Sequence, residues 1–462
     1  MQVETPNLQQ QHLTALIERY TKRTKTSKQM GQAYRSVLAD PRVPEWFNLA
    51  TKEMCYLTVG TKAKGSRIWD IDGNEYIDII MGFGSNLLGH NPSFIQAAII
   101  EQLEKGIPLG PQSELVGEVA QLISEMTGME RVAFSNTGTE AVMTSIRLAR
   151  AATKRSKIAI FSGAYHGHFD GTLAQAHENS RAVPIAPGVL PGMVEDVLIL
   201  DYGSSQSLEI IKAYQDELAA VLVEPVQTRR PDLQPQEFLQ QLRQLTEQSG
   251  ITLIFDEMIT GFRLHLGGAQ AWFGVEADIA TYGKVVGGGM PIGVIAGKAT
   301  YMDKIDGGMW NYDDASFPQV ERTFFAGTHC KHPLSIAAAR AVLKYLKLQG
   351  SSLQTELNQR TAQYVEQLNI FFAAKHLPIR MGNFGSFFGP IFLPEFSGAE
   401  ISSFMTGLNL LRYHLFDRGI LLRGEGGGFL STSHTDEDID DIIQAMKDSI
   451  NEIQAAGFFP NL

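Results

Sequence analysis

The chain has 462 residues, a formal net charge of −11 and 19% charged residues. This length allows two to three domains with a large buried core, and the acidic balance gives no support to a nucleic-acid partner. No apolar run approaches the roughly 20 residues that cross a bilayer, the first residues show no secretory signal, and two cysteines are too few for a disulfide framework. We therefore expect a cytoplasmic protein without a membrane or nucleic-acid partner.

The first part of the chain is polar and leads into a hairpin. Residues 1–10 are predicted to be a disordered end, and residues 11–20 have helical spacing of apolar residues. Residues 65–78 predict two strands joined by a turn at Asp72, Gly73 and Asn74. We expect residues 1–50 to form an N-terminal arm or linker, and residues 51–110 to pack with the smaller domain.

Helices then alternate with short apolar strands. The predicted helices of this region span residues 93–105, 113–127, 139–154 and 235–249. The predicted strands span residues 132–134, 157–161, 197–200, 219–223, 251–255, 279–282 and 292–296. Strands that alternate with helices indicate βαβ units and a mainly parallel sheet, so residues 111–330 predict a large α/β domain.

The last part of the chain predicts a smaller α+β domain over residues 331–462. Its predicted helices span residues 333–348, 351–375, 402–418 and 435–456. Its predicted strands span residues 384–392, 421–423 and 429–431.

The strongest chemical signal joins an aspartate to a lysine. Asp256 closes one apolar strand, and Lys284 follows another and precedes three glycines. In open α/β sheets, ligands bind at the carboxyl ends of the strands. A lysine there can hold an aldehyde cofactor as a Schiff base, and an aspartate can keep a pyridinium nitrogen protonated. The spacing alone is also compatible with a solvated Lys284 side chain and with an Asp256 whose only role is capping.

Two further loops suggest cofactor contacts. Residues 135–141 lie between a short strand and a helix, which predicts either a phosphate site or a plain helix cap, and the Walker pattern is absent. Tyr165 lies in a glycine-flanked loop after a strand, where its ring can stack on a planar group. His166 and His168 have no convincing third ligand nearby, so we expect no metal.

Together these segments resemble the class III family of pyridoxal-phosphate-dependent aminotransferases, over roughly residues 50–450. The resemblance implies the fold type I architecture of that enzyme class: a large domain on a mainly parallel seven-stranded sheet, plus a smaller α+β domain. It also implies that pyridoxal 5′-phosphate is the cofactor and that Lys284 and Asp256 are catalytic, the first as the Schiff-base lysine and the second as the partner of the ring nitrogen.

The same resemblance implies the remaining cofactor contacts. Gly138 and Thr139 hold the phosphate, Tyr165 stacks on the ring, and Gln227 contacts the ring hydroxyl. Thr328 matches a threonine that reaches the phosphate in the neighbouring subunit, which implies a homodimer.

Within the family, the chain looks most similar to glutamate-1-semialdehyde aminomutases and to aminotransferase domains of hybrid polyketide–peptide synthases. The aminomutase pattern G-G-V-N-S-P-V-R is missing before the first hairpin. We therefore expect transamination of a β-ketoacyl thioester on an acyl carrier protein to a β-aminoacyl thioester, with glutamate or glutamine as donor, in natural-product biosynthesis. The alternative is a glutamate-1-semialdehyde 2,1-aminomutase or a small-molecule omega-aminotransferase. A PLP-fold protein retained for regulation usually loses the lysine, which is present here.

Four residues are candidates for substrate contacts. Gly84 leaves out side-chain bulk just after the first hairpin, where a pantetheine arm would need a groove, and Ser85 and Asn86 offer hydrogen bonds to its amides. The glycine can equally serve only a turn. Arg423 follows a predicted strand and can clamp a carboxylate in a bidentate manner, or be an ordinary surface arginine.

Overall fold

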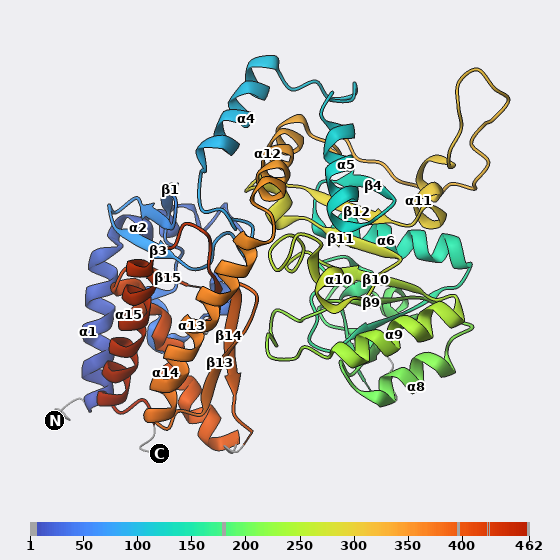
Figure 1. Ribbon diagram of the computed structural model, residues 1–462. Helices are drawn as coiled ribbons and strands as arrows, with labels where there is room; N and C mark the ends of the chain where they lie inside the picture. The colour runs from blue at the N-terminus through green and yellow to red at the C-terminus, as the bar shows by residue number, and fades with distance from the viewer. Residues whose placement is uncertain (1–6, 178–181, 395–397, 423, 425, 460–462) are drawn as a thin grey trace.

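The computed structural model describes residues 7–177, 182–394, 398–422, 424 and 426–459. Two bodies are visible in Figure 1. One contains the largest sheet with helices on both sides, and the other contains both ends of the chain. Helices α4 and α12 lie between them at the top of the view.

The largest sheet has seven strands in the order β4-β12-β11-β10-β9-β5-β8. These strands are β4 (Arg131–Ser135), β5 (Lys157–Phe161), β8 (Val197–Leu200), β9 (Leu218–Val223), β10 (Thr252–Asp256), β11 (Ile279–Tyr282) and β12 (Gly293–Gly297). Neighbours from β11 to β8 are parallel, whereas β12 runs antiparallel to both β4 and β11. The predicted mainly parallel, seven-stranded sheet is therefore confirmed.

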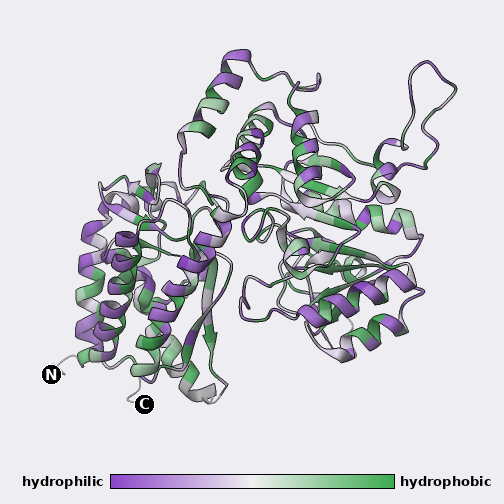
Figure 2. Ribbon diagram, in the orientation of Figure 1, coloured by the Kyte–Doolittle hydropathy of each residue, from purple (hydrophilic) through white to green (hydrophobic). Residues whose placement is uncertain are grey.

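The central strands are buried on both faces. Leu253 and Phe255 of β10 belong to one apolar cluster, and Ile254 between them belongs to a second cluster on the opposite face. Successive side chains of a strand point to opposite faces, so continuous apolar runs are what a doubly covered sheet requires. Figure 2 shows the hydrophobic residues concentrated along these strands.

Helices cover this sheet, and short elements fill its edges. The helices are α4 (Ser93–Lys105), α5 (Val116–Thr127), α6 (Gly138–Thr153), α7 (Pro191–Val194), α8 (Ser205–Ala213), α9 (Gln236–Ser249), α10 (Gly268–Phe273), α11 (Ala299–Asp306) and α12 (Pro333–Gln349). The short elements are η2 (Asp170–Thr172), η4 (Lys284–Gly287), β6 (Ala174–Ala176) and β7 (Ala182–Pro184). Helix α6 packs across strands β4, β9, β10, β11 and β12.

The second body combines the two ends of the chain. Its four-stranded sheet has the order β1-β2-β3-β15, and its three-stranded sheet has the order β13-β14-β16. The strands are β1 (Gly60–Lys64), β2 (Arg67–Asp70), β3 (Glu75–Asp78), β13 (Ile379–Phe384), β14 (Phe387–Phe392), β15 (Ile420–Leu421) and β16 (Gly428–Phe429). The helices are α1 (Leu8–Arg23), α2 (Lys25–Tyr34), α3 (Arg42–Glu45), η1 (Leu49–Met54), α13 (Ser352–Ala374), α14 (Gly398–Asp417) and α15 (Asp436–Ala455).

The predicted hairpin around residue 73 is confirmed by the antiparallel pair β2–β3. Two predictions were wrong. The disorder expected for residues 1–10 does not hold for residues 8–10, because helix α1 begins at Leu8, where Asn7 caps it and Leu16 and Tyr20 bury its apolar side. Residues 1–6 lie outside the described residues. Strand β13 was missed, although it pairs with β14 along its whole length. None of the described helices combines the length and hydropathy that a membrane span requires.

Candidate active site

Chain segments that follow five strands meet at one edge of the seven-stranded sheet. Strands β4, β5, β9, β10 and β11 share one direction, so their carboxyl ends lie together. A cavity of about 1940 Å³ opens at this edge. Its walls include Gly138, Thr139, Tyr165, Asp256 and Lys284. The tertiary structure therefore brings most of the predicted cofactor residues into one cavity, at the edge where open α/β sheets bind ligands.

Lys284 follows β11 and opens the short helix η4. Its backbone φ is 31°, which is a sparsely populated conformation for a residue with a side chain. The Nζ ammonium group donates a hydrogen bond to the carbonyl oxygen of Phe83 at 3.0 Å. The amine thus lies against the loop after β3, on the wall of the cavity.

Asp256 is buried at the end of β10 and shares its carboxylate with a histidine. His166 Nδ1 lies 2.8 Å from Asp256 Oδ2. The other oxygen, Oδ1, accepts weaker hydrogen bonds from the Met258 amide at 3.2 Å and from the Thr281 hydroxyl at 3.3 Å. His166 Nε2 is buried without a hydrogen-bond partner among the described residues. This His–Asp pair was missed in the sequence, where His166 was considered only as a metal ligand.

The N-terminus of helix α6 faces the cavity. The Thr137 side chain accepts a hydrogen bond from the Glu140 amide, and Glu140 Oε2 accepts one from the Asn136 amide at 2.7 Å. Gly138 and Thr139 of the first turn line the cavity. A helix N-terminus with exposed amides binds phosphate well, because its dipole and its free N–H groups both favour an anion.

Tyr165 presents a ring that is ready for a stacking partner. Tyr165 lines the cavity and is 63% exposed, and none of the described aromatic rings stacks on its ring. The buried Glu224 carboxylate accepts hydrogen bonds from the Tyr165 amide at 3.3 Å and from the Thr228 amide at 2.9 Å. Burial raises the pKa of Glu224, and the hydrogen bonds from Thr228 oppose that rise.

Two of the predicted cofactor residues lie outside the cavity wall. Gln227 is buried, and its Nε2 amide donates to the Ser162 carbonyl at 2.9 Å. Thr328 is exposed and does not line the cavity of its own chain. A contact of Thr328 with a neighbouring subunit therefore remains a prediction.

These residues fit pyridoxal phosphate. An anion-binding helix start, an unstacked tyrosine ring, a buried carboxylate and a lysine amine lie around one cavity. They would hold in turn the phosphate, the ring face, the ring nitrogen and the aldehyde of that cofactor. When bound there, it would supply an electron sink for a carbanion next to an amino group.

The loop after β3 has a left-handed backbone at four consecutive residues. The φ angles are 46° at Met81, 60° at Gly82, 55° at Phe83 and 92° at Gly84. Two of these residues carry side chains, so the loop needs outside support. Arg263 provides it, because its Nη2 donates to the Gly84 carbonyl at 2.6 Å.

Arg263 is completely buried at the end of the segment that begins with Asp256. Its Nη1 donates to the Ser386 hydroxyl at 2.8 Å and to the Leu430 carbonyl at 3.1 Å. Burial lowers the pKa of this guanidinium to about 9. Arg263 thus ties the Phe83–Gly84 loop to the turn between β13 and β14 and to the chain after β16, a role that the motif alone did not reveal.

The groove expected at Gly84 is not formed. A Cβ at Gly84 would lie 2.9 Å from the Phe429 ring, so this glycine allows close packing rather than an open channel. Ser85 does line the cavity. Asn86 does not, and its Nδ2 instead lies 3.1 Å from His90 Nδ1. Arg423 lies outside the described residues.

Comparisons with known proteins identify the family of the chain. The family model "Aminotransferase class-III" matches residues 49–449. A glutamate-1-semialdehyde 2,1-aminomutase of Lachnoclostridium phytofermentans is 36% identical over 392 residues, which cover 82% of this chain and 89% of the relative. The chain therefore belongs to the class III aminotransferase family, whose members use pyridoxal phosphate.

Solved structures of transaminases share the fold. An omega-transaminase from Sphaerobacter thermophilus superposes with a TM-score of 0.81 at 26% identity, covering 93% of this chain and 98% of that one. A β-phenylalanine aminotransferase from Variovorax paradoxus gives 0.79 at 27% identity, covering 96% and 98%. None of the three names mentions a carrier protein, so an acyl-carrier partner finds no support among them.

Proposed function

We propose that this enzyme transfers an amino group between two substrates that bind in turn, with glutamate or glutamine as donor. The Lys284 Nζ amine would act as the base that takes the proton from the amino-bearing carbon of the donor, and it would carry that proton as an ammonium group. Asp256, supported by His166, would keep the cofactor ring nitrogen protonated. Gly138, Thr139, Tyr165 and Gln227 of the same chain, and Thr328 of a second subunit, complete the proposed cofactor site.

The proposed acceptor is a β-ketoacyl thioester tethered to an acyl carrier protein, which would leave as a β-aminoacyl thioester for natural-product biosynthesis. The supporting observation is the cavity, which exceeds the roughly 300–1,000 Å³ of ordinary small-molecule sites. It extends from Lys284 to residues of α1 and α14 in the second body, such as Leu13 and Thr406. The same cavity also has to hold pyridoxal phosphate, and the part that extends to the second body is the space we assign to the tethered chain.

The relatives favour a second candidate. The Lachnoclostridium phytofermentans relative is named for glutamate-1-semialdehyde, and the similarity spans most of both chains. An aminomutase retains its single substrate throughout the reaction and needs no tether. A small-molecule omega-aminotransferase, as in the Sphaerobacter thermophilus structure, is the related possibility.

A competition experiment separates the candidates. The holoenzyme is offered a β-ketoacyl carrier protein with glutamate and, in parallel, glutamate-1-semialdehyde alone. We expect the higher kcat/KM for the tethered ketone. A higher value for glutamate-1-semialdehyde would refute the tethered acceptor and favour the aminomutase. The Lys284→Ala variant should lose both activities, which controls for a contaminating enzyme.

A further inference from the structure

One wall of the cavity carries a buried arginine that the proposed chemistry does not use. Arg412 lies on α14, is only 9% exposed and lines the cavity. Its guanidinium carbon lies 4.4 Å from the ring centroid of Trp46 and 4.4 Å from that of Tyr413. Its Nη2 also donates a hydrogen bond to the Tyr413 hydroxyl. Two aromatic side chains therefore contact the cation within the cavity wall.

Arg412 has no acidic partner among the described residues. In the part of the chain that the structure describes, no carboxylate lies within 4.0 Å of its guanidinium. Glu45, which also lines the cavity, forms no ion pair with it. Arginines are seldom buried unless they are paired, because removing a cation from water is costly.

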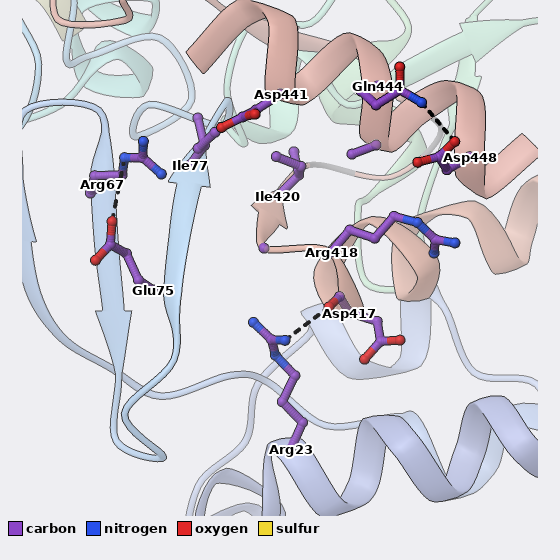
Figure 3. Close-up of a pocket in the computed structure, with 12 residues that line it drawn as sticks. Arg23, Arg67, Glu75, Ile77, Asp417, Arg418, Ile420, Asp441, Gln444 and Asp448 are labelled. Atoms are coloured by element: carbon purple, nitrogen blue, oxygen red, sulfur yellow. Dashed lines mark hydrogen bonds and ion pairs between the residues drawn. The ribbon is translucent and has the colours of Figure 1, made fainter. Parts of the chain in front are cut away.

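Several other arginines of the same body do have partners, and some of them line a smaller charged pocket of about 510 Å³. Figure 3 shows Arg67 bonded to Glu75 and Arg23 bonded to the backbone of Asp417. Arg418, which lines the same pocket, pairs with Glu452. In this smaller pocket Arg67 and Arg418 therefore each have a carboxylate partner, in contrast to Arg412.

We propose that Arg412, held between Trp46 and Tyr413, is a binding site for an oxyanion on the part of the substrate remote from the reacting carbon. The Tyr413 hydroxyl uses one N–H of Nη2. The remaining N–H groups have no acceptor among the described residues and are left for a planar or tetrahedral oxyanion, which an arginine binds in a bidentate manner. The oxyanion is a carboxylate of a free substrate or the phosphate of a pantetheine arm. The inference deepens the proposed function and rests on it only in the kinetic test.

An equilibrium titration tests the site without turnover. Trp46 is one of four tryptophans, so replacing Trp69, Trp272 and Trp310 with phenylalanine leaves it as the reporter of the site. The holoenzyme is titrated at constant ionic strength with glutarate, with pantetheine 4′-phosphate, and with the neutral analogues glutaramide and pantetheine. We expect a saturable change in Trp46 fluorescence with an anion and none with the neutral analogues, and the better anion identifies the source.

Substitutions connect this signal to the guanidinium. Arg412→Gln should weaken anion binding at least tenfold, and Arg412→Lys should give an intermediate affinity because it keeps the charge but loses the fork. Arg229→Gln is the matched control, since Arg229 is an exposed arginine on the same cavity, and it should change the affinity less than twofold. Bound anion should also raise the melting temperature of the parent protein but not of Arg412→Gln.

The result that overturns the inference is specific. Absence of saturable binding by both anions up to 10 mM, or unchanged binding by Arg412→Gln, would mean that Arg412 only anchors the segment around Trp46. In the kinetic test, Arg412→Gln should raise KM for an anionic acceptor about tenfold with little change in kcat. If the enzyme turns over neither proposed acceptor but the titration succeeds, the proposed function fails and the anion site stands.

Discussion

At the scale of single residues, the site depends on buried charges whose partners come from distant segments. The Asp256 carboxylate contacts His166, which lies in the loop after β5. The neighbouring Glu257 accepts hydrogen bonds from the Ala269 amide at 2.6 Å and the Gln270 amide at 3.1 Å at the start of α10. Burial raises the pKa of Glu257 to about 7. The two neighbouring acids therefore differ in role: Asp256 lines the cavity, whereas Glu257 binds backbone amides inside the protein.

The role of Asp256 gives the first prediction. Asp256→Asn should still bind pyridoxal phosphate but lose about 100-fold or more in kcat, because a neutral amide cannot hold the proton on the ring nitrogen. Single-turnover kinetics at saturating cofactor measures this loss. Thr281→Val is the control, because it removes only the 3.3 Å hydrogen bond to Oδ1 and should cost little. A rate near that of the parent would show that the ring nitrogen has another partner.

At the scale of elements, a pair of histidines contributes to the contact between helix α1 and helix α14 within the second body. His12 Nε2 of α1 lies 3.1 Å from His414 Nε2 of α14. His414 Nδ1 faces Glu452 of α15 at 3.6 Å, and Arg418 binds the same carboxylate. At this distance, one of the two Nε2 atoms must accept the hydrogen bond. If both imidazoles were protonated, two N–H groups and two positive charges would face each other and repel.

This pair predicts an acid-sensitive attachment. Burial lowers the pKa of His414 to about 3, and that of His12 is also lowered, whereas the ordinary value is 6.5. The undocked state therefore binds more protons below pH 6.5, and the stabilisation of docked α1 is complete above that value and declines as the pH falls toward 3. Hydrogen exchange of residues 8–23, corrected for intrinsic rates, should lose protection between pH 7 and pH 5 relative to α9.

The His414→Gln variant should flatten this pH dependence, because glutamine can accept a hydrogen bond but does not titrate. His177→Gln serves as the control, since His177 is exposed on another part of the molecule. The same loss of protection in His414→Gln as in the parent would locate the titrating group elsewhere.

At the scale of the whole molecule, an apolar surface extends from the large body. The connection between α11 and α12 projects away from the sheet at the right of Figure 1. It carries five exposed large side chains: Met309, Trp310, Tyr312, Phe317 and Phe324. Exposed apolar groups clustered in this way are typical of interaction surfaces.

We predict that this connection contributes to a homodimer that places Thr328 near the cofactor of the second subunit. Tyr312→Ser combined with Phe324→Ser should shift the protein toward a monomer in sedimentation velocity and weaken retention of pyridoxal phosphate on dialysis. Leu348→Ser, which alters an exposed residue of α12, should change neither property. A parent protein that sediments as a monomer and retains the cofactor tightly would contradict the prediction.

The sequence by itself determined the parallel architecture and the reactive pair. Apolar runs of four to six residues between helices predict buried parallel strands, and residues that end such strands must share one edge. The amino-acid pattern therefore placed Asp256 and Lys284 at strand ends and the start of α6 after a strand, and the family resemblance joined them into one expected site.

Only the tertiary structure decided which distant side chains support that edge. Arg263 reaches Gly84 across 179 positions, and Arg412 stacks on Trp46 from the other end of the chain. The expected groove at Gly84 is occupied by Phe429 for the same reason. Such contacts depend on how helices and sheets pack against one another, and no local period or spacing carries that information.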